Sequence, residues 1–298
     1  MNSVPSEMPA ELFPPLEPSA SGLLDVGEGQ SIYWEECGNP RGKAALVVHG
    51  GPGIGCTPRM RRAFDPGRYR IVLFDQRGTG RSRPHASEPT VDMRSNTTHG
   101  SIADMERLRE HLGIDRWLLS GGSWGTTLAL AYAERFPARV SGLVLANIAL
   151  SRKRDIDWLY RGVARFFPEE WQHFRNGVPV AERDDLVRAY ARAMEDGERR
   201  EAAALSWAHW EDAVLSLEPN AKPRPYSDRP SADLIAFVRI CSHYFAHAAW
   251  LEDDELLQNA ERLSEIPGVI IHGRLDLSSP LQGAWELSRA WSRAKFHI

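Results

Sequence analysis

The chain has 298 residues, of which 42% are hydrophobic and 26% charged, as expected for a globular core domain with an inserted subdomain. Its 36 basic and 40 acidic residues are scattered along the chain and give a net charge of −4, so it lacks the basic stripe that nucleic-acid binding needs. We expect arginine-rich stretches such as Arg59–Arg62 to be solvated helix faces.

The three cysteines, Cys37, Cys56 and Cys241, are odd in number and lack metal-ligand spacing. This disfavours both a disulfide framework and a metal site, and a reducing compartment fits best. The first twenty residues do not have the pattern of a secretory signal, and no run of about 18 apolar residues predicts a membrane span. We therefore expect a cytoplasmic protein that binds no membrane, and its oligomeric state stays open.

Residues 1–20 contain five prolines, which predicts an extended arm. From residue 21 to 150, short apolar runs that predict buried strands alternate with helical patterns. The strands are expected at Ala44–Val48, Ile71–Phe74, Trp117–Leu119 and Leu143–Leu145, and the helices at Ile102–Leu112 and Thr126–Phe136. This alternation predicts an α/β fold with a mostly parallel central sheet and helices on both faces.

Residues 151–260 carry helical patterns with almost no strand signal, which predicts an all-helical cap inserted into the sheet domain. A proline-rich break divides the cap in two (Pro219, Pro223, Pro225 and Pro230). The strand pattern returns at Val269–Ile271, and a helix is expected near Leu281–Trp291. Residues 261–298 are therefore expected to form a second part of the core.

The segment Gly121-Gly122-Ser123-Trp124-Gly125 follows a predicted strand and opens a predicted helix. In such a tight turn the flanking positions accept only glycine, and the serine takes strained backbone angles that expose its hydroxyl at the carboxyl end of the sheet. The helix N-terminus beneath it favours developing negative charge. A glycine-rich turn with a serine cap is the alternative, but the context predicts that Ser123 is a nucleophile.

The segment His49-Gly50-Gly51-Pro52-Gly53 directly follows the strand Ala44–Val48. A loop of this type at this point supplies one backbone N–H to an oxyanion hole. We expect Gly51 to supply it and the backbone N–H of Trp124 to be the second donor. By itself the segment is equally consistent with a plain turn, and its position ahead of the Ser123 turn favours the oxyanion loop.

Asp276, in Gly273-Arg274-Leu275-Asp276, lies just after the strand Val269–Ile271. A single aspartate in a loop is more often a turn residue or a helix cap. Here its position after the cap matches the chain order Ser…Asp…His of a hydrolase triad, which favours an orienting carboxylate.

Taken together, these segments resemble the prolyl aminopeptidase (proline iminopeptidase) family of serine α/β-hydrolases. The resemblance rests on His49–Gly53, Asp75–Ser82, Asn96–Thr98 and Gly121–Gly125, and it extends over nearly the whole chain. It implies release of N-terminal proline from short peptides through an acyl-enzyme on Ser123, with no metal and no cofactor.

In that family, carboxylates from the cap hold the free imino group of the substrate, and Glu211 matches one of them. A buried cationic amine does need an anionic partner. Considered alone, Glu211 beside two tryptophans would be a solvated helix residue. The nearby aromatics Trp207, Trp210, Tyr244 and Phe245 either wall an apolar slot for the pyrrolidine ring or belong to the cap core.

The chain departs from the family pattern at Cys241, where a second recognition carboxylate is usual. A missing carboxylate in a buried site should weaken binding of the cationic terminus by roughly a few kcal/mol. It puts strict specificity for N-terminal proline in question.

A second departure concerns the triad histidine, which should follow one further strand beyond Asp276. The sequence ends at Ala294–Ile298, which is expected to be the start of that strand and to contain His297 as a strand residue. None of the ten histidines has the expected context. Without a general base a serine hydroxyl is scarcely ionised, and only residual catalysis remains. We therefore expect a fragment, or a gene that has lost its tail.

Two alternatives stay open at this point. A broader serine esterase or amidase is slightly favoured by Cys241, and a catalytically impaired pseudoenzyme or binding module is favoured by the missing histidine. Haloalkane dehalogenases and epoxide hydrolases are disfavoured, because they place an acid where Ser123 stands.

Overall fold

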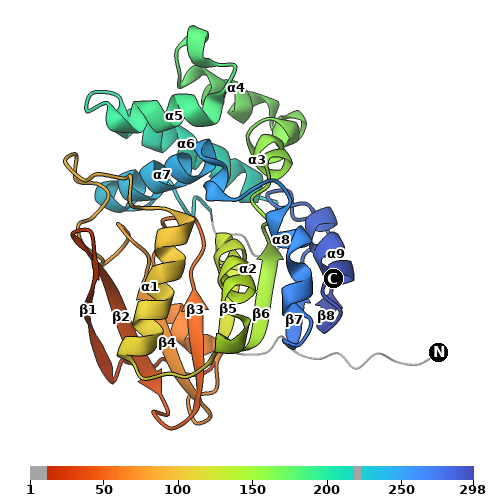
Figure 1. The fold of residues 1–298 in the computed structure, drawn as a ribbon. Coiled ribbons are helices and arrows are strands. Elements are labelled where there is room, and N and C mark those ends of the chain that lie inside the picture. The colour runs from red at the N-terminus through yellow and green to blue at the C-terminus, as the bar shows by residue number, and fades with distance from the viewer. Residues whose placement is uncertain (1–11, 218–222) are drawn as a thin grey trace.

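A computed structural model describes residues 12–217 and 223–298 (Figure 1). Within these ranges the chain forms one eight-stranded sheet with the strand order β1-β2-β4-β3-β5-β6-β7-β8. The strands are β1 (Ala20–Gly27), β2 (Gln30–Gly38), β3 (Lys43–Val48), β4 (Tyr69–Asp75), β5 (Trp117–Ser123), β6 (Val140–Ile148), β7 (Gly268–Ile271) and β8 (Ala294–His297).

The strands β3 to β8 pair in parallel, whereas β1 and β2 join the edge of the sheet in antiparallel fashion. The mostly parallel sheet predicted from the sequence is therefore confirmed, and each predicted strand is present. The strands β1 and β2 were not predicted. Neither contains a long continuous apolar run, because Asp25 interrupts β1 and Glu35 and Glu36 interrupt β2.

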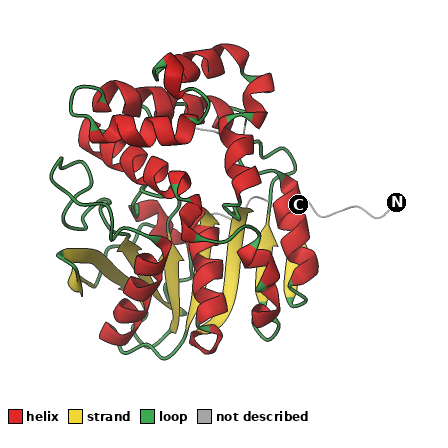
Figure 2. Cartoon of the chain, turned by 45° about the horizontal axis from the view of Figure 1, so that its top comes forward, coloured by secondary structure: helices red, strands yellow, loops and turns green. Residues whose placement is uncertain are grey.

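Alternate residues of the central strands are buried on opposite faces of the sheet. Leu46 and Val72 belong to one hydrophobic cluster, and their neighbours Ala45 and Ile71 belong to another. The first cluster includes residues of α1 (Thr98–His111) and α2 (Trp124–Arg135), which lie against the sheet in Figures 1 and 2. Burial on both faces explains why these strands are apolar at consecutive positions.

A layer of helices lies above the sheet domain (Figure 1). It contains α3 (Lys153–Tyr160), α4 (Pro168–Asn176), α5 (Leu186–Glu195), α6 (Arg200–Leu215) and α7 (Ser231–Ala246). The chain then returns to the sheet through α8 (Glu255–Gln258), and α9 (Leu281–Ala290) connects β7 to β8. The helical layer has its own hydrophobic cluster, built on aromatic side chains such as Phe174, Tyr190 and Trp207.

The division of the chain into an arm, two core segments and a cap, with the boundaries given above, stays a prediction. Residues 1–11 of the expected arm and Pro219 of the expected break lie outside the described residues. The remaining prolines of that break lie between the end of α6 and the start of α7. In the described part of the chain no single helix is long and apolar enough to span a membrane, although the bent pair Ser231–Ala246 and Ala248–Gln258 passes by length and composition.

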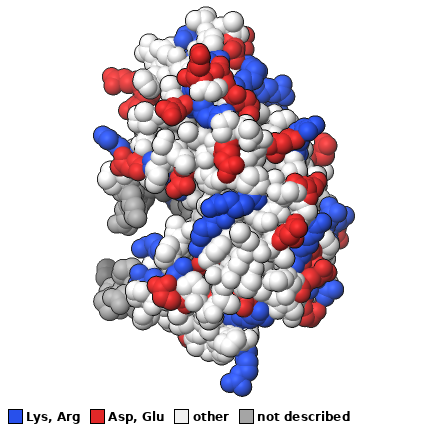
Figure 3. Space-filling view, turned by 90° about the vertical axis from the view of Figure 1, so that its left-hand side faces the viewer, with Lys and Arg blue, Asp and Glu red and all other residues white. Residues whose placement is uncertain are grey.

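The expectation for Arg59–Arg62 is wrong at Arg61. This residue lies in a 3-10 helix (Pro58–Ala63) and is only 6% exposed. Its Nε donates to Glu35 Oε1 at 2.7 Å, so a tertiary ion pair draws the guanidinium inside. The face drawn in Figure 3 shows basic and acidic side chains intermingled, as the scattered charge of the sequence predicts.

Candidate active site

Ser123 stands at the junction between β5 and α2, at the carboxyl end of a central strand. Its backbone has φ 53° and ψ −128°, a strained conformation for a residue with a side chain. A Cβ at Gly121 would collide with the carbonyl of Gly125, and one at Gly125 would collide with the carbonyl of Val48. The two flanking glycines are thus required by the close approach of three backbone segments.

Ser123 lines a cavity of about 90 Å³ between the sheet and the helical layer. Gly51 and Trp124 line it on the sheet side, and Glu211 and Phe245 line it on the helical side. The remaining walls are mainly apolar, including Ile148, Leu150, Ile156, Leu159, Val214 and Leu215. An apolar cavity with a few polar groups at its ends is typical of a small-molecule site.

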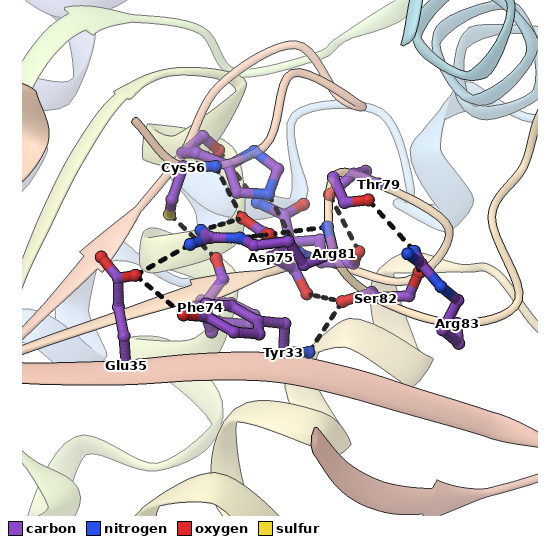
Figure 4. Close-up of polar contacts among 12 residues, drawn as sticks. Tyr33, Glu35, Cys56, Phe74, Asp75, Thr79, Arg81, Ser82 and Arg83 are labelled. Carbon is purple, nitrogen blue, oxygen red and sulfur yellow. Dashed lines mark hydrogen bonds and ion pairs between the residues drawn. The ribbon is translucent and has the colours of Figure 1, made fainter. Parts of the chain in front are cut away.

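Gly51 lies in the loop after β3 and has φ 113°, a conformation that favours glycine. The far end of this loop is fastened to the end of β4: the backbone N–H of Cys56 donates to Asp75 Oδ1 at 2.7 Å, and its thiol donates to the carbonyl of Phe74 at 3.0 Å. Arg81 forms an ion pair with Asp75 at 2.8 Å (Figure 4). The loop is therefore held by a buried carboxylate that is paired with the partly exposed Arg81.

Glu211 is 9% exposed, so it is not the solvated residue that its neighbours in sequence would suggest. Its Oε1 accepts hydrogen bonds from Tyr160 Oη at 2.6 Å and from Trp207 Nε1 at 2.8 Å. Burial raises the pKa of this carboxyl to about 7, against the opposing effect of these hydrogen bonds. No lysine or arginine forms an ion pair with Glu211 within residues 12–217 and 223–298.

Of the other three residues expected to bind substrate, only one lies at the cavity. Phe245 lines the cavity, whereas Cys241 and Tyr244 do not. Cys241 is fully buried behind Glu211, and its thiol points to Glu211 Oε1 at 3.8 Å. Tyr244 packs edge-on against Trp124 and donates its hydroxyl to Asn96 Oδ1 at 2.8 Å.

The tryptophans of the expected slot belong to the interior of the helical layer. Trp207 and Trp210 are at most 1% exposed and contact Phe174. Sequence reasoning missed Tyr160, which comes from α3 and provides the shortest hydrogen bond to Glu211. No local signal marks this tyrosine, because its partner is 51 residues away in the chain.

Asp276 lies in the loop after β7 and is 7% exposed. It accepts hydrogen bonds from Asn147 Nδ2 at 3.0 Å, Ser278 Oγ at 2.7 Å and the backbone N–H of Ser279 at 2.8 Å. Ser278 and Ser279 line the cavity, although Asp276 itself does not. The carboxylate is therefore held firmly beside the site.

His272 adjoins Asp276, with Nε2 3.8 Å from Asp276 Oδ2, but it has other partners. Its Nδ1 accepts from the backbone N–H of Ile148 at 2.9 Å, so Nε2 carries the proton and donates to the carbonyl of Ser279 at 2.7 Å. No histidine lines the cavity, and Ser123 Oγ makes no hydrogen bond, within the described ranges. His297 lies in β8, as predicted. A search of the same residues finds no cluster of side chains that would hold a metal ion.

Comparison with known proteins places this geometry in a family. A family profile described as the alpha/beta hydrolase fold matches residues 44–298. The proline iminopeptidase of Xanthomonas citri is 47% identical over 292 residues, covering 96% of this chain and 91% of that protein. The proline iminopeptidase of Arabidopsis thaliana is 44% identical over 292 residues, covering 96% of this chain and 75% of that protein.

Among solved structures, the proline iminopeptidase of Mycobacterium smegmatis has the same fold, with a TM-score of 0.61 and 19% sequence identity. The alignment covers 94% of this chain and 89% of that one. With the profile match over most of the chain and relatives near 45% identity over almost its full length, the assignment follows: the chain belongs to the proline iminopeptidase family of α/β hydrolases.

Proposed function

We propose that the protein is a serine aminopeptidase that releases N-terminal proline from short peptides. Ser123 Oγ attacks the carbonyl of the first residue, and its proton passes to the amine of the second residue, which leaves. Water then attacks the acyl-enzyme, proline is released, and a proton of the water returns to Ser123 Oγ. The backbone N–H groups of Gly51 and Trp124 stabilise the oxyanion. Asp276 serves as the orienting carboxylate. No step requires a metal or a cofactor.

The observation that carries this proposal is the placement of Ser123 and Glu211 in one small cavity, on its sheet side and its helical side. A substrate whose reacting carbonyl sits at Ser123 would place its free imino group near Glu211. A cationic amine enclosed by protein needs an anionic partner. Glu211 can be that partner, because no lysine or arginine in the described part of the chain forms an ion pair with it. The apolar walls suit a pyrrolidine ring.

The test is release of the fluorophore from proline-β-naphthylamide, beside alanine-β-naphthylamide and a simple aryl ester. We expect release that favours proline and that disappears in Ser123→Ala. The matched control is Ser288→Ala, which removes the hydroxyl of a serine on α9 and should leave the rate unchanged. Faster ester turnover with no dependence on a free N-terminus would instead support the broader esterase or amidase.

A second candidate function is a binding module that retains the proline pocket without efficient turnover. The absence of a histidine around Ser123 in the described residues favours it, because an unactivated hydroxyl reacts slowly. The discriminating observation is calorimetric binding of prolinamide by a folded chain that releases no fluorophore. Release of the fluorophore that depends on Ser123 would exclude this candidate and would show that some group acts as the general base for Ser123.

The cellular location and the binding partners of the protein are also proposals. We place it in the cytoplasm, acting on short peptides and neither on nucleic acid nor at a membrane. The support is its intermingled surface charge and its three free cysteines, Cys37, Cys56 and Cys241. Fractionation of cells that produce the protein would test the location.

A further inference from the structure

Gln76 is the first residue after β4, a position where three strand ends meet. In the sheet β4 pairs with β3, and β3 pairs with β5, so the oxyanion loop after β3 and the Ser123 turn after β5 both emerge beside it. Gln76 is 4% exposed and does not line the cavity. It was part of the segment Asp75–Ser82 that carried the family resemblance, without a role of its own.

The side chain of Gln76 joins the two halves of the expected oxyanion hole. Its Nε2 donates to the carbonyl of His49 at 2.9 Å, at the start of the loop that carries Gly51. Its Oε1 accepts from the indole Nε1 of Trp124 at 3.0 Å. A carboxamide donates at one end and accepts at the other, so neither a carboxylate nor an aliphatic side chain satisfies both partners.

The backbone of Gln76 adds a third link, because its N–H donates to His49 Nε2 at 3.0 Å. The far end of the same loop is bound by Asp75 through the backbone N–H of Cys56, as Figure 4 shows. The end of β4 therefore holds the loop at both ends. Of these two residues, only Gln76 also contacts the residue after the nucleophile.

We propose that Gln76 is a positioning residue that sets the distance between the two backbone N–H donors of the oxyanion hole. It acts through His49 and Trp124 and does not touch substrate, so it should affect the transition state more than substrate binding. This inference rests on the proposed function for its natural substrate. It concerns a separate property, the preorganisation of the hole around Ser123.

The test compares Gln76→Met with Thr79→Val. Gln76→Met keeps the length of the side chain and removes both hydrogen bonds. Thr79→Val removes one buried hydrogen bond in the same turn, from Thr79 Oγ1 to the carbonyl of Gln76 at 3.0 Å, without touching the oxyanion loop. Each variant is measured for folding, for kcat and KM with proline-β-naphthylamide, and for covalent modification by a fluorophosphonate. In that modification Ser123 Oγ bonds to phosphorus and fluoride leaves.

We expect Gln76→Met to lower kcat by roughly 10- to 100-fold with KM changed less than about twofold, and to slow fluorophosphonate labelling by a similar factor. Thr79→Val should lower thermal stability without either kinetic effect. Trp124→Phe removes the indole donor together with part of the ring that packs against Tyr244. Its effect on kcat should not add to that of Gln76→Met, because both changes break the same hydrogen bond.

Labelling separates this inference from the proposed function. If the wild-type chain is labelled at Ser123 but hydrolyses neither naphthylamide, the peptidase proposal fails, while slower labelling of Gln76→Met still supports the positioning role. Unchanged labelling and kcat in a folded Gln76→Met overturn the inference, as does an equal loss in Thr79→Val. A folded wild-type chain that the probe does not modify counts against both.

Discussion

The carboxyl edge of the sheet and the helical layer above it both bury carboxylates, but they surround them differently. At the sheet edge, Glu35 forms an ion pair with Arg61 at 2.7 Å. It forms a second with Arg81 at 2.8 Å, which Figure 4 shows. In the helical layer, Glu211 receives its hydrogen bonds from the neutral groups of Tyr160 and Trp207.

The two environments have opposite effects on acidity. Burial alone would raise the pKa of Glu35, but the hydrogen bonds and charges of Arg61 and Arg81 hold it below its usual value. Burial raises the pKa of Glu211 to about 7, and no lysine or arginine among the described residues forms an ion pair that would lower it. Glu35 is thus paired with two cations before any substrate arrives, whereas in the proposed function the cationic amine of the substrate is the partner of Glu211.

The largest effect on stability should come from breaking a buried ion pair. Arg77 binds Asp104 of α1 through two hydrogen bonds of 2.7 and 2.8 Å, and both side chains are at most 2% exposed. Asp104→Asn removes the buried anion of Arg77 and leaves it only the exposed Glu28, at 2.7 Å, as an anionic partner among the described residues. It should lower the free energy of unfolding by about 3–5 kcal/mol. Urea denaturation measures this loss.

The control for that prediction is Asp92→Asn, at a solvent-exposed ion pair with Arg94. It should leave the urea midpoint unchanged. If Asp104→Asn lowered the free energy of unfolding no more than Asp92→Asn does, the buried ion pairs at the sheet edge would not be needed for stability.

The next prediction concerns Glu211, whose substitution should weaken ligand binding without destabilising the fold. Glu211→Gln, made in a Ser123→Ala background to prevent turnover, should weaken prolinamide binding by about 1.5–3 kcal/mol, or roughly 10- to 100-fold in Kd. Without ligand the same change should leave the free energy of unfolding unchanged or slightly raised, because no cation loses its partner. Calorimetric titration and urea denaturation measure the two quantities.

Asp155→Asn provides the matched control, since Asp155 also lines the cavity but already binds Arg152 at 2.8 Å. Its effect on prolinamide affinity should be smaller than that of Glu211→Gln. An equal effect would place the cation elsewhere in the cavity.

The raised pKa of Glu211 predicts a dependence of binding on pH. Below about pH 7 the carboxyl is increasingly neutral, and a cationic amine binds the ionised form. Prolinamide affinity should therefore fall as the pH is lowered from 7.5 to 5.5, by up to roughly 25-fold. Glu211→Gln should remove this dependence, and a dependence that survives in the variant would assign it to another group.

The stability of the ligand-free chain should depend on pH in the opposite direction and rise as the pH is lowered. Because the folded pKa of Glu211 lies above its usual value of 4.5, its contribution to stability is fully present below pH 4.5 and is lost as the pH rises through about 7. Burial raises the pKa of Glu134 to about 9, which adds a trend of the same sign. The Tm difference between wild type and Glu211→Gln over this pH range isolates the part due to Glu211.

The smallest effect is expected at Cys241. Its thiol is a weak donor 3.8 Å from Glu211 Oε1, and it does not line the cavity. Cys241→Ser should therefore change prolinamide affinity by less than about 1 kcal/mol. A loss as large as that of Glu211→Gln would show that the thiol takes part in cation recognition.

Much of the frame of the site was predictable from local sequence. Continuous apolar runs predicted the central strands, because strands buried on both faces need no alternation. The Gly121–Gly125 and His49–Gly53 segments predicted the turn at Ser123 and the loop at Gly51, because glycines at fixed spacing report backbone approaches that no side chain allows.

The remaining features depended on contacts between distant parts of the chain. A polar residue such as Arg61, Gln76 or Glu211 has the same local pattern whether it faces water or an interior partner, and only the partner decides. Gln76 reaches Trp124 across 48 residues, and Glu211 reaches Tyr160 across 51. Sequence alone thus determined where backbone geometry is constrained. The tertiary structure decided which buried charges are paired with an opposite charge and which, like Glu211, accept hydrogen bonds from neutral groups, because those partners come from distant parts of the chain.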